Sequence, residues 1–131
     1  MLRVQSRLSD ELEDLIHKVI GCCITVHRAL GPGLLEGIYS RAVSIELQAN
    51  GIPFETEKPV PVYYRGHLLC HQRLDFVVNG EVVLEIKSVE QLVTINRAQL
   101  LSYLRASKLP VGLLMNFNVT VLQDGIRRLV L

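Results

Sequence analysis

Residues 73–87, RLDFVVNGEVVLEIK, decide the fold because they form the most strand-like segment of the chain. Two apolar runs flank Asn79-Gly80, a dipeptide typical of the turn between antiparallel strands. Charges nevertheless interrupt both runs, with Asp75 in the first and Glu85 and Lys87 in the second. Because buried charges cost free energy unless they are paired, the stretch predicts a hairpin whose charges have a chemical role.

The position of Asp75 depends on the length of the turn. Side chains alternate along a strand, so Glu85 and Lys87 share one face of the sheet. A two-residue turn would place Asp75 on the opposite face, whereas a three-residue turn or one bulge would place it close to Glu85. If the three charges act together, this turn cannot be a simple two-residue one.

The composition of the 131-residue chain fits one domain spanning residues 1–131. Apolar residues make up 49% of the chain, which is enough for a core and for an interface as well. The formal net charge of +1 argues mildly against a strong, autonomous nucleic-acid binder, but it allows a small cationic patch.

Cysteine usage and hydropathy indicate the compartment. Cys22, Cys23 and Cys70 form an odd set without framework spacing, which favours reduced thiols, and we interpret the adjacent Cys22 and Cys23 as small core residues. No apolar run approaches the roughly 20 residues of a membrane span, and the first residues lack the apolar region of a signal peptide. We therefore expect a cytoplasmic protein without membrane contact.

The N-terminal part of the chain has the pattern of two helices. Ser9, followed by acidic residues, predicts the start of a helix over about 9–30, which Gly31-Pro32-Gly33 ends. A second helix is expected over about 34–49, with Asn50-Gly51 closing it. The apolar stripe predicted for this second helix consists of Leu35, Ile38, Ala42, Ile45 and Ala49.

The remainder, residues 53–131, has the pattern of a sheet with one further helix. Two prolines place residues 58–64 on an edge strand, and strands from about 69 or 71 to 78 and over 81–88 complete a meander. A helix is predicted over 94–107, capped by Thr94, with Ala98, Leu100, Leu101 and Leu104 facing inward, and a central strand over 111–116. Residues 119–122 and 126–131 around Asp124-Gly125 predict a C-terminal β-hairpin, giving an α/β fold with a mixed central sheet flanked by helices.

Two neighbouring carboxylates and one ammonium group suit the chemistry of phosphate esters. Asp75 and Glu85 would repel each other unless a proton, a lysine or a divalent cation relieved them. Carboxylate oxygens are ligands for Mg²⁺ or Mn²⁺, and the carbonyl of Ile86 could supply a further oxygen. Lys87 could then hold an attacking water or stabilise the charge that develops on phosphate.

Several motifs in order resemble a known superfamily. Asp75 followed by Glu85-x-Lys87 resembles the PD-(D/E)XK nucleases, whose restriction-endonuclease-like αβββαβ core agrees with the predicted order of elements. GLLEGIY at residues 33–39 is similar to the motif of the GxxExxY proteins within that superfamily. The flanking text also resembles that family, in VHRALGPG at 26–33, AQLLSYL at 98–104, and LLMNFNV with the terminal DGIRRLVL.

The resemblance implies a role for five residues. Asp75 and Glu85 would be the metal-binding pair, with Glu36 as an additional helical acid and metal ligand. Lys87 would be the catalytic lysine, and Gln99 would contact substrate or the lysine. Leu74 stands where the superfamily often has proline, and Asn96 stands where the family commonly has histidine, which puts a base at that position in doubt.

Three functions remain open from the residues alone. The first is a nuclease-like, metal-dependent phosphodiesterase that acts on DNA or RNA, and the second is an inactive module of the same fold that binds nucleic acid or a protein. The third is hydrolysis of a small phosphate ester. We expect a homodimer, with the C-terminal hairpin or the first helix as its interface.

Other polar residues favour structural interpretations. His27 is expected to be a satisfied core or cap residue, and Tyr39 and Tyr103 are expected to pack with their hydroxyl groups bonded. His67 and His71 share a strand face that Cys70 does not, which argues against a zinc site. Arg127 and Arg128 form a surface pair, and a cationic rim could come from Arg65, Arg97, Arg105 and Lys108.

Overall fold

The computed structural model describes residues 7–131. In chain order its elements are α1 (Asp10–Leu30), α2 (Glu36–Ala49), β1 (Phe54–Tyr64), β2 (His67–Val78), β3 (Val82–Lys87), α3 (Thr94–Ser107), β4 (Val111–Asn116), the 3₁₀ helix η1 (Leu122–Gly125) and β5 (Ile126–Val130).

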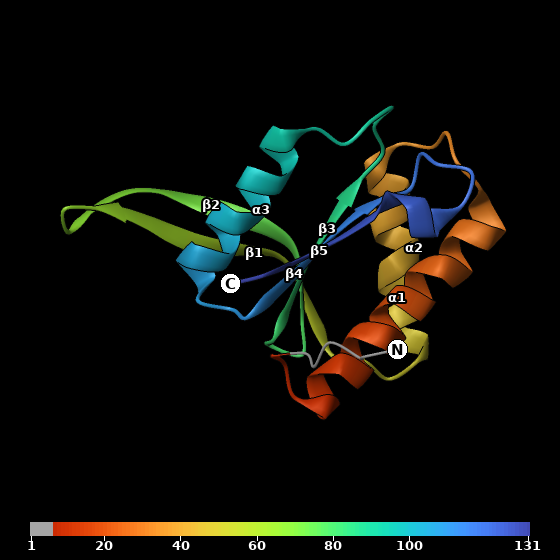
Figure 1. Ribbon diagram of the computed structural model, residues 1–131, viewed down its shortest axis with the longest axis horizontal. Helices are drawn as coiled ribbons and strands as arrows, with labels where there is room; N and C mark the ends of the chain where they lie inside the picture. Colours follow the sequence, from red (N-terminus) through yellow and green to blue (C-terminus); the bar gives the residue numbers. More distant parts are fainter. Residues whose placement is uncertain (1–6) are drawn as a thin grey trace, which may run out of the picture.

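One five-stranded sheet in the order β1-β2-β3-β4-β5 organises the described residues. Neighbouring strands are antiparallel except β3 and β4, which are parallel and are connected through α3. Helices α1 and α2 lie on one side of the sheet and α3 lies on the other (Figure 1). The predicted α/β fold with a mixed sheet flanked by helices is confirmed, and it is consistent with a restriction-endonuclease-like core.

Two apolar clusters hold the layers together and orient β3. Leu84 and Ile86 point into the cluster formed with α1 and α2, while Val83 points into the cluster formed with α3. Side chains alternate along a strand, so Glu85 and Lys87 follow Val83 onto the face that α3 covers. This agrees with the predicted alternation and places the two charges under a helix rather than in open solvent.

The turn between β2 and β3 has three residues, Asn79, Gly80 and Glu81, because Val78 pairs with Val82. The turn is therefore the three-residue alternative, which meets the condition for Asp75 to lie close to Glu85. Pairing of the two strands ends at Phe76 and Leu84. Beyond that point β2 remains paired only with β1, while β3 continues along β4, so the sheet opens into a fork (Figure 1).

The prediction of a strand over residues 119–122 is wrong. Leu122–Gly125 forms the 3₁₀ helix η1, and β5 pairs with β4 instead. Asp124-Gly125 resembles a hairpin turn, yet Gly125 does not have the positive φ that such a turn demands. A side chain at position 125 would overlap the carbonyl oxygen of Asn116, so this glycine is required for close backbone approach.

The predicted inward face of α2 is also wrong. Leu35 is 78% exposed and Ile45 is 62% exposed, whereas Tyr39, Val43 and Leu47 are buried. Helix α2 has apolar residues on both of these faces, so periodicity alone does not determine which one packs. The face with Tyr39, Val43 and Leu47 is the one that packs into the core between α2 and the sheet.

The other helices follow their predicted patterns more closely. Ser9 caps α1 by accepting a hydrogen bond from the Leu12 amide, as predicted. Thr94 does not cap α3, because the side chain of Asn96 accepts a hydrogen bond of 2.9 Å from the Val93 amide instead. Leu100, Tyr103 and Leu104 of α3 are buried and Leu101 is partly buried, whereas Ala98 is exposed, contrary to its prediction.

Candidate active site at the sheet fork

Asp75 and Glu85 lie together where β2 and β3 separate. The Asp75 amide donates a hydrogen bond of 3.0 Å to Oε1 of Glu85, and the Ile86 amide donates one of 2.9 Å to Oδ2 of Asp75. These side chains thus bind backbone groups that the separated strands can no longer pair with each other. Where the strands separate, two backbone amides lose their partners in the sheet, and each carboxylate accepts a hydrogen bond from one of them. The acidic pair therefore stabilises the fork.

Burial and mutual repulsion alter the protonation of the pair. Burial, and then the nearby Asp75 charge, raises the pKa of Glu85 to about 8. Burial also raises the pKa of Asp75, although the Ile86 amide and the Lys87 charge act in the opposite direction. The mutual interaction of the two side chains raises the pKa of Glu85 and lowers that of Asp75, so the pair favours binding a proton when no cation is present.

Lys87 and Tyr103 both interact electrostatically with the pair. Lys87, the last residue of β3, is half-buried, and its charge lowers the pKa of both carboxyl groups. Burial raises the pKa of Tyr103, and the charges of Glu85 and Asp75 raise it further. This places Tyr103 of α3 within electrostatic reach of the acids. The sequence indicated only a packing role for this residue.

The loop before α2 is held by Tyr39. The Tyr39 hydroxyl donates a 2.5 Å hydrogen bond to the Gly31 carbonyl and accepts one of 3.2 Å from the Leu34 amide. Its ring stacks on Phe117, with 4.6 Å between the ring centroids. The packing interpretation of Tyr39 is confirmed, and the last residue of the GLLEGIY motif fixes the shape of the loop that opens it.

The same loop is attached to the end of β3. Ser88 Oγ donates a 2.5 Å hydrogen bond to the Leu34 carbonyl, directly after the lysine at the fork. Gly33, with φ of 97°, allows the chain to turn into this contact. The first residue of α2 is Glu36, so the loop brings this exposed acid to the side of the fork, where its charge raises the pKa of Asp75.

Glu36 is nevertheless not a third member of a closed acidic cluster. No group of three histidine, cysteine or acidic side chains within residues 7–131 has the arrangement of a metal site. Asp75 and Glu85 still fit a hard cation, because two adjacent carboxylates that otherwise retain a proton are a suitable donor set. Mg²⁺ commonly binds through only one or two carboxylates together with water and substrate oxygens.

Gln99 is exposed on α3, and among the described residues no hydrogen bond joins it to Lys87. Its expected role toward substrate stays a prediction. His27 is buried and its Nε2 lies 2.8 Å from the Val119 carbonyl, as expected for a satisfied core residue. Cys22 and Cys23 are buried in the core, as predicted, whereas Cys70, His67 and His71 are exposed on β2.

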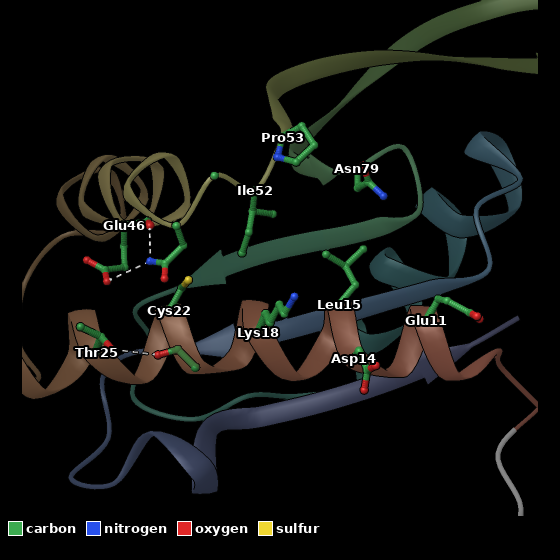
Figure 2. Close-up of a pocket in the computed structure, with 13 residues that line it drawn as sticks. Glu11, Asp14, Leu15, Lys18, Cys22, Thr25, Glu46, Ile52, Pro53 and Asn79 are labelled. Carbon is green, nitrogen blue, oxygen red and sulfur yellow. Dashed lines mark hydrogen bonds between the residues drawn. The ribbon is translucent and has the colours of Figure 1, made fainter.

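Two hollows lie near α2. One of about 210 Å³ adjoins Asp75 and includes Arg41, Ser44 and Glu57 in its lining, so Asp75 is accessible from the α2 side as well. Another of about 750 Å³ lies between α1 and the chain around Ile52 and contains neither acid of the fork (Figure 2).

The forked α/β sheet, with a carboxylate on each of two separating strands and a lysine beside them, has the architecture of a nuclease-like protein. The family model described as the PD-(D/E)XK nuclease superfamily matches residues 13–129, so the chain belongs to this superfamily. Comparisons with curated proteins and with solved structures gave no match. No helix in the described part of the chain is long and apolar enough to cross a membrane.

Proposed function

We propose that this protein is a metal-dependent phosphodiesterase of the GxxExxY type that hydrolyses phosphodiester bonds in nucleic acid. The observation that supports it is the acidic pair at the fork. Asp75 and Glu85 are held side by side by backbone amides, although burial and repulsion disfavour the charge on both. A purely structural fork could be closed by neutral side chains, so the costly carboxylates favour a chemical role.

The residues present fit Mg²⁺ or Mn²⁺. Asp75 and Glu85 would hold the cation, with the Ile86 carbonyl as a further oxygen and Glu36 contributing from the side of α2. The cation supplies charge neutralisation at the scissile phosphate and makes water more acidic. Because Glu85 has a pKa of about 8 in the protein alone, it must lose its proton before it can become a ligand.

Three further residues could contact substrate, namely Lys87, Tyr103 and Gln99. The Lys87 ammonium can position the attacking water or stabilise the negative charge that grows on phosphate in the transition state. The Tyr103 hydroxyl can donate a hydrogen bond to a phosphate oxygen, since its raised pKa keeps it protonated. Gln99, exposed on the same helix, is available to the substrate. The unpaired thiols are compatible with a cytoplasmic location.

The test is a cleavage assay on single- and double-stranded DNA and RNA with Mn²⁺ or Mg²⁺. Glu85→Gln and Lys87→Ala should each lower the rate by at least roughly a hundredfold, because Glu85 would hold the cation and Lys87 would act on the reacting phosphate. Glu81→Gln, which removes a carboxylate from the turn of the same hairpin, should leave the rate unchanged. Cleavage that persists in both site variants would reject the proposed site.

A second candidate is a module of the same fold without catalysis, and the absence of a third clustered acid within residues 7–131 favours it. In that case Lys87 would serve only to neutralise the acids, whose pKa values it lowers. Calorimetric titration with Mn²⁺ separates the candidates. Binding that Asp75→Ala abolishes supports the enzyme, and no binding at millimolar metal supports the module.

A further inference from the structure

Strands β1 and β2 continue beyond the fork as a ribbon of two strands that projects from the body of the molecule (Figure 1). We define the arm as residues 61–71, all of which are half-buried or exposed. At about 3.3 Å per residue, its two strands extend roughly 15 Å past Val60, the last buried residue of β1. An isolated ribbon of two strands is only marginally stable in water, and contact with a binding partner would stabilise its conformation.

The charge of the arm and its base is of one sign. Residues 58–74 contain Lys58, Arg65 and Arg73, together with His67 and His71, and no acidic residue. The rest of the chain carries all 13 acids and brings the total charge close to neutral. Although the net charge of the whole protein is close to zero, the projecting segment is basic. A local basic patch of this kind is typical of a surface that contacts nucleic acid.

The cations of the arm and of its base, residues 58–60 and 72–74, are available for binding. Arg65 lies at the tip, with its guanidinium 5.8 Å from the centroid of the Tyr64 ring. None of the ion pairs found within residues 7–131 involves Arg65. Arg73 pairs with Glu57 at 3.8 Å, but both side chains are about three-quarters exposed, so this pair contributes little and can be exchanged.

The tip also exposes apolar and aromatic groups. Tyr63, Tyr64 and Leu69 are each 62% exposed, and Leu68 is 52% exposed. Aromatic and aliphatic side chains beside arginine suit the sugar and base edges of nucleic acid as well as its phosphates. A charged surface loop without a partner would not be expected to expose four large apolar side chains to solvent. Their exposure beside the cations therefore indicates a binding surface.

We propose that the arm is a DNA-binding ribbon that enters the major groove of double-stranded DNA and holds it against the fork. The inference deepens the proposed function by naming its substrate class. A two-stranded ribbon fits the major groove of B-form DNA, which is about 12 Å wide. The major groove of duplex RNA is too deep and narrow for side chains to read, which favours DNA over RNA.

The position of the arm relative to the acids supports the same conclusion. Arg73 lies two residues before Asp75, so the return strand of the arm leads directly into the fork. A duplex that the arm grips would place phosphates along β2 toward the acidic pair. Arg65 and Arg73 would contact phosphates between the tip of the arm and the fork. The arm would thus hold the duplex even though the rest of the protein is not basic.

Binding can be measured without hydrolysis, which separates this inference from the proposed function. Fluorescence anisotropy of a labelled DNA duplex, with chelator present, would be recorded over a range of salt concentrations. Arg65→Ala/Arg73→Ala should bind about tenfold more weakly at physiological salt, with a log–log salt slope reduced by about 2. The charge-matched control Arg7→Ala/Lys18→Ala, with both changes away from the arm, should bind as the unchanged protein does.

The outcomes distinguish the alternatives. Duplex binding that survives in the arm variant, with its circular dichroism unchanged, would overturn the inference, as would tighter binding of duplex RNA than of duplex DNA. A change in sedimentation with no change in DNA affinity would identify the arm as a contact between two copies of the chain. If the unchanged protein binds no duplex the inference fails, whereas binding without hydrolysis would support the arm and count against the proposed catalysis.

Discussion

Glu85 shows how strongly the fork departs from an ordinary strand face. Its pKa rises from an ordinary value of 4.5 to about 8, so the folded protein binds a proton there that the unfolded chain releases above about pH 4.5. With chelator present, this contribution to stability is complete below pH 4.5 and is lost as the pH rises to about 8. Urea denaturation of Glu85→Gln should show a flatter pH dependence and, at pH 8, a free energy of unfolding higher by roughly 1–3 kcal/mol.

The matched control for this pH dependence is Glu81→Gln, which neutralises a carboxylate in the turn of the same hairpin. The Asn79 side chain donates a 2.8 Å hydrogen bond to Glu81 in an exposed setting, so this variant should keep the slope of the unchanged protein. Equal slopes for all three proteins would show that Glu85 titrates normally, and the electrostatic description of the fork would then be wrong.

Gly125 is a second residue whose importance is local and steric. Gly125→Ala should lower the free energy of unfolding by roughly 2–4 kcal/mol, because its Cβ would overlap the Asn116 carbonyl oxygen and force the backbone apart. Gly37→Ala is the control, since position 37 is helical with open space around it, and this change should stabilise the protein by about 0.5–1 kcal/mol. Thermal denaturation of both variants measures the difference, and similar melting temperatures would contradict the close approach.

The two residues also show what sequence reasoning can reach at this scale. Asp75 could be placed beside Glu85 in advance because strand alternation has a period of two, and only the length of one turn had to be decided. Gly125 could not be interpreted correctly, because a glycine needed for backbone contact and a glycine needed for positive φ look the same in a sequence. Only the path of β5 back along β4 distinguishes them.

At the scale of elements, α2 presents two apolar faces of which only one packs. Leu47 is fully buried and Ile45 is 62% exposed, although both are aliphatic residues of one helix. Leu47→Ala should cost about 2–5 kcal/mol through the cavity that it leaves, whereas Ile45→Ala should change stability by about 0.5 kcal/mol or less. Chemical denaturation of both variants tests the orientation of the helix, and a reversed order would mean that the predicted stripe of Leu35, Ile38 and Ile45 packs after all.

The fork itself could not be predicted from the pattern of its strands. The sequence indicated β2 and β3 as a hairpin with alternating faces, and this is what forms near the turn. The place where the strands part depends on β3 pairing with β4 on its other side, which is a contact distant along the chain. The same separation turns the outer part of β1 and β2 into an arm, so the projection that carries Arg65 was not apparent before the sheet order was known.

On the scale of the whole molecule, the sheet brings together pieces of the site from distant parts of the chain. Helix α2 presents Glu36, the two separating strands present Asp75 and Glu85, and α3 presents Tyr103. Each piece alone has a simple structural explanation, such as a helix start or a packing residue. The chain belongs to the PD-(D/E)XK nuclease superfamily over residues 13–129, and the proposed function would give these pieces one common role at the fork.

Because these pieces meet only in the folded state, a cation bound at the fork should stabilise the entire molecule. If Mn²⁺ binds with a millimolar dissociation constant, a tenfold excess over that value would add about 1.4 kcal/mol to the free energy of unfolding and raise Tm by about 3–5 °C. Differential scanning fluorimetry with Mn²⁺, with Ca²⁺ and with chelator measures this shift. Asp75→Asn should lose it while Asp14→Asn, on the outside of α1, should retain it. An equal shift in both variants would place the bound cation elsewhere than at the fork, and no shift in the unchanged protein would favour the module without metal chemistry.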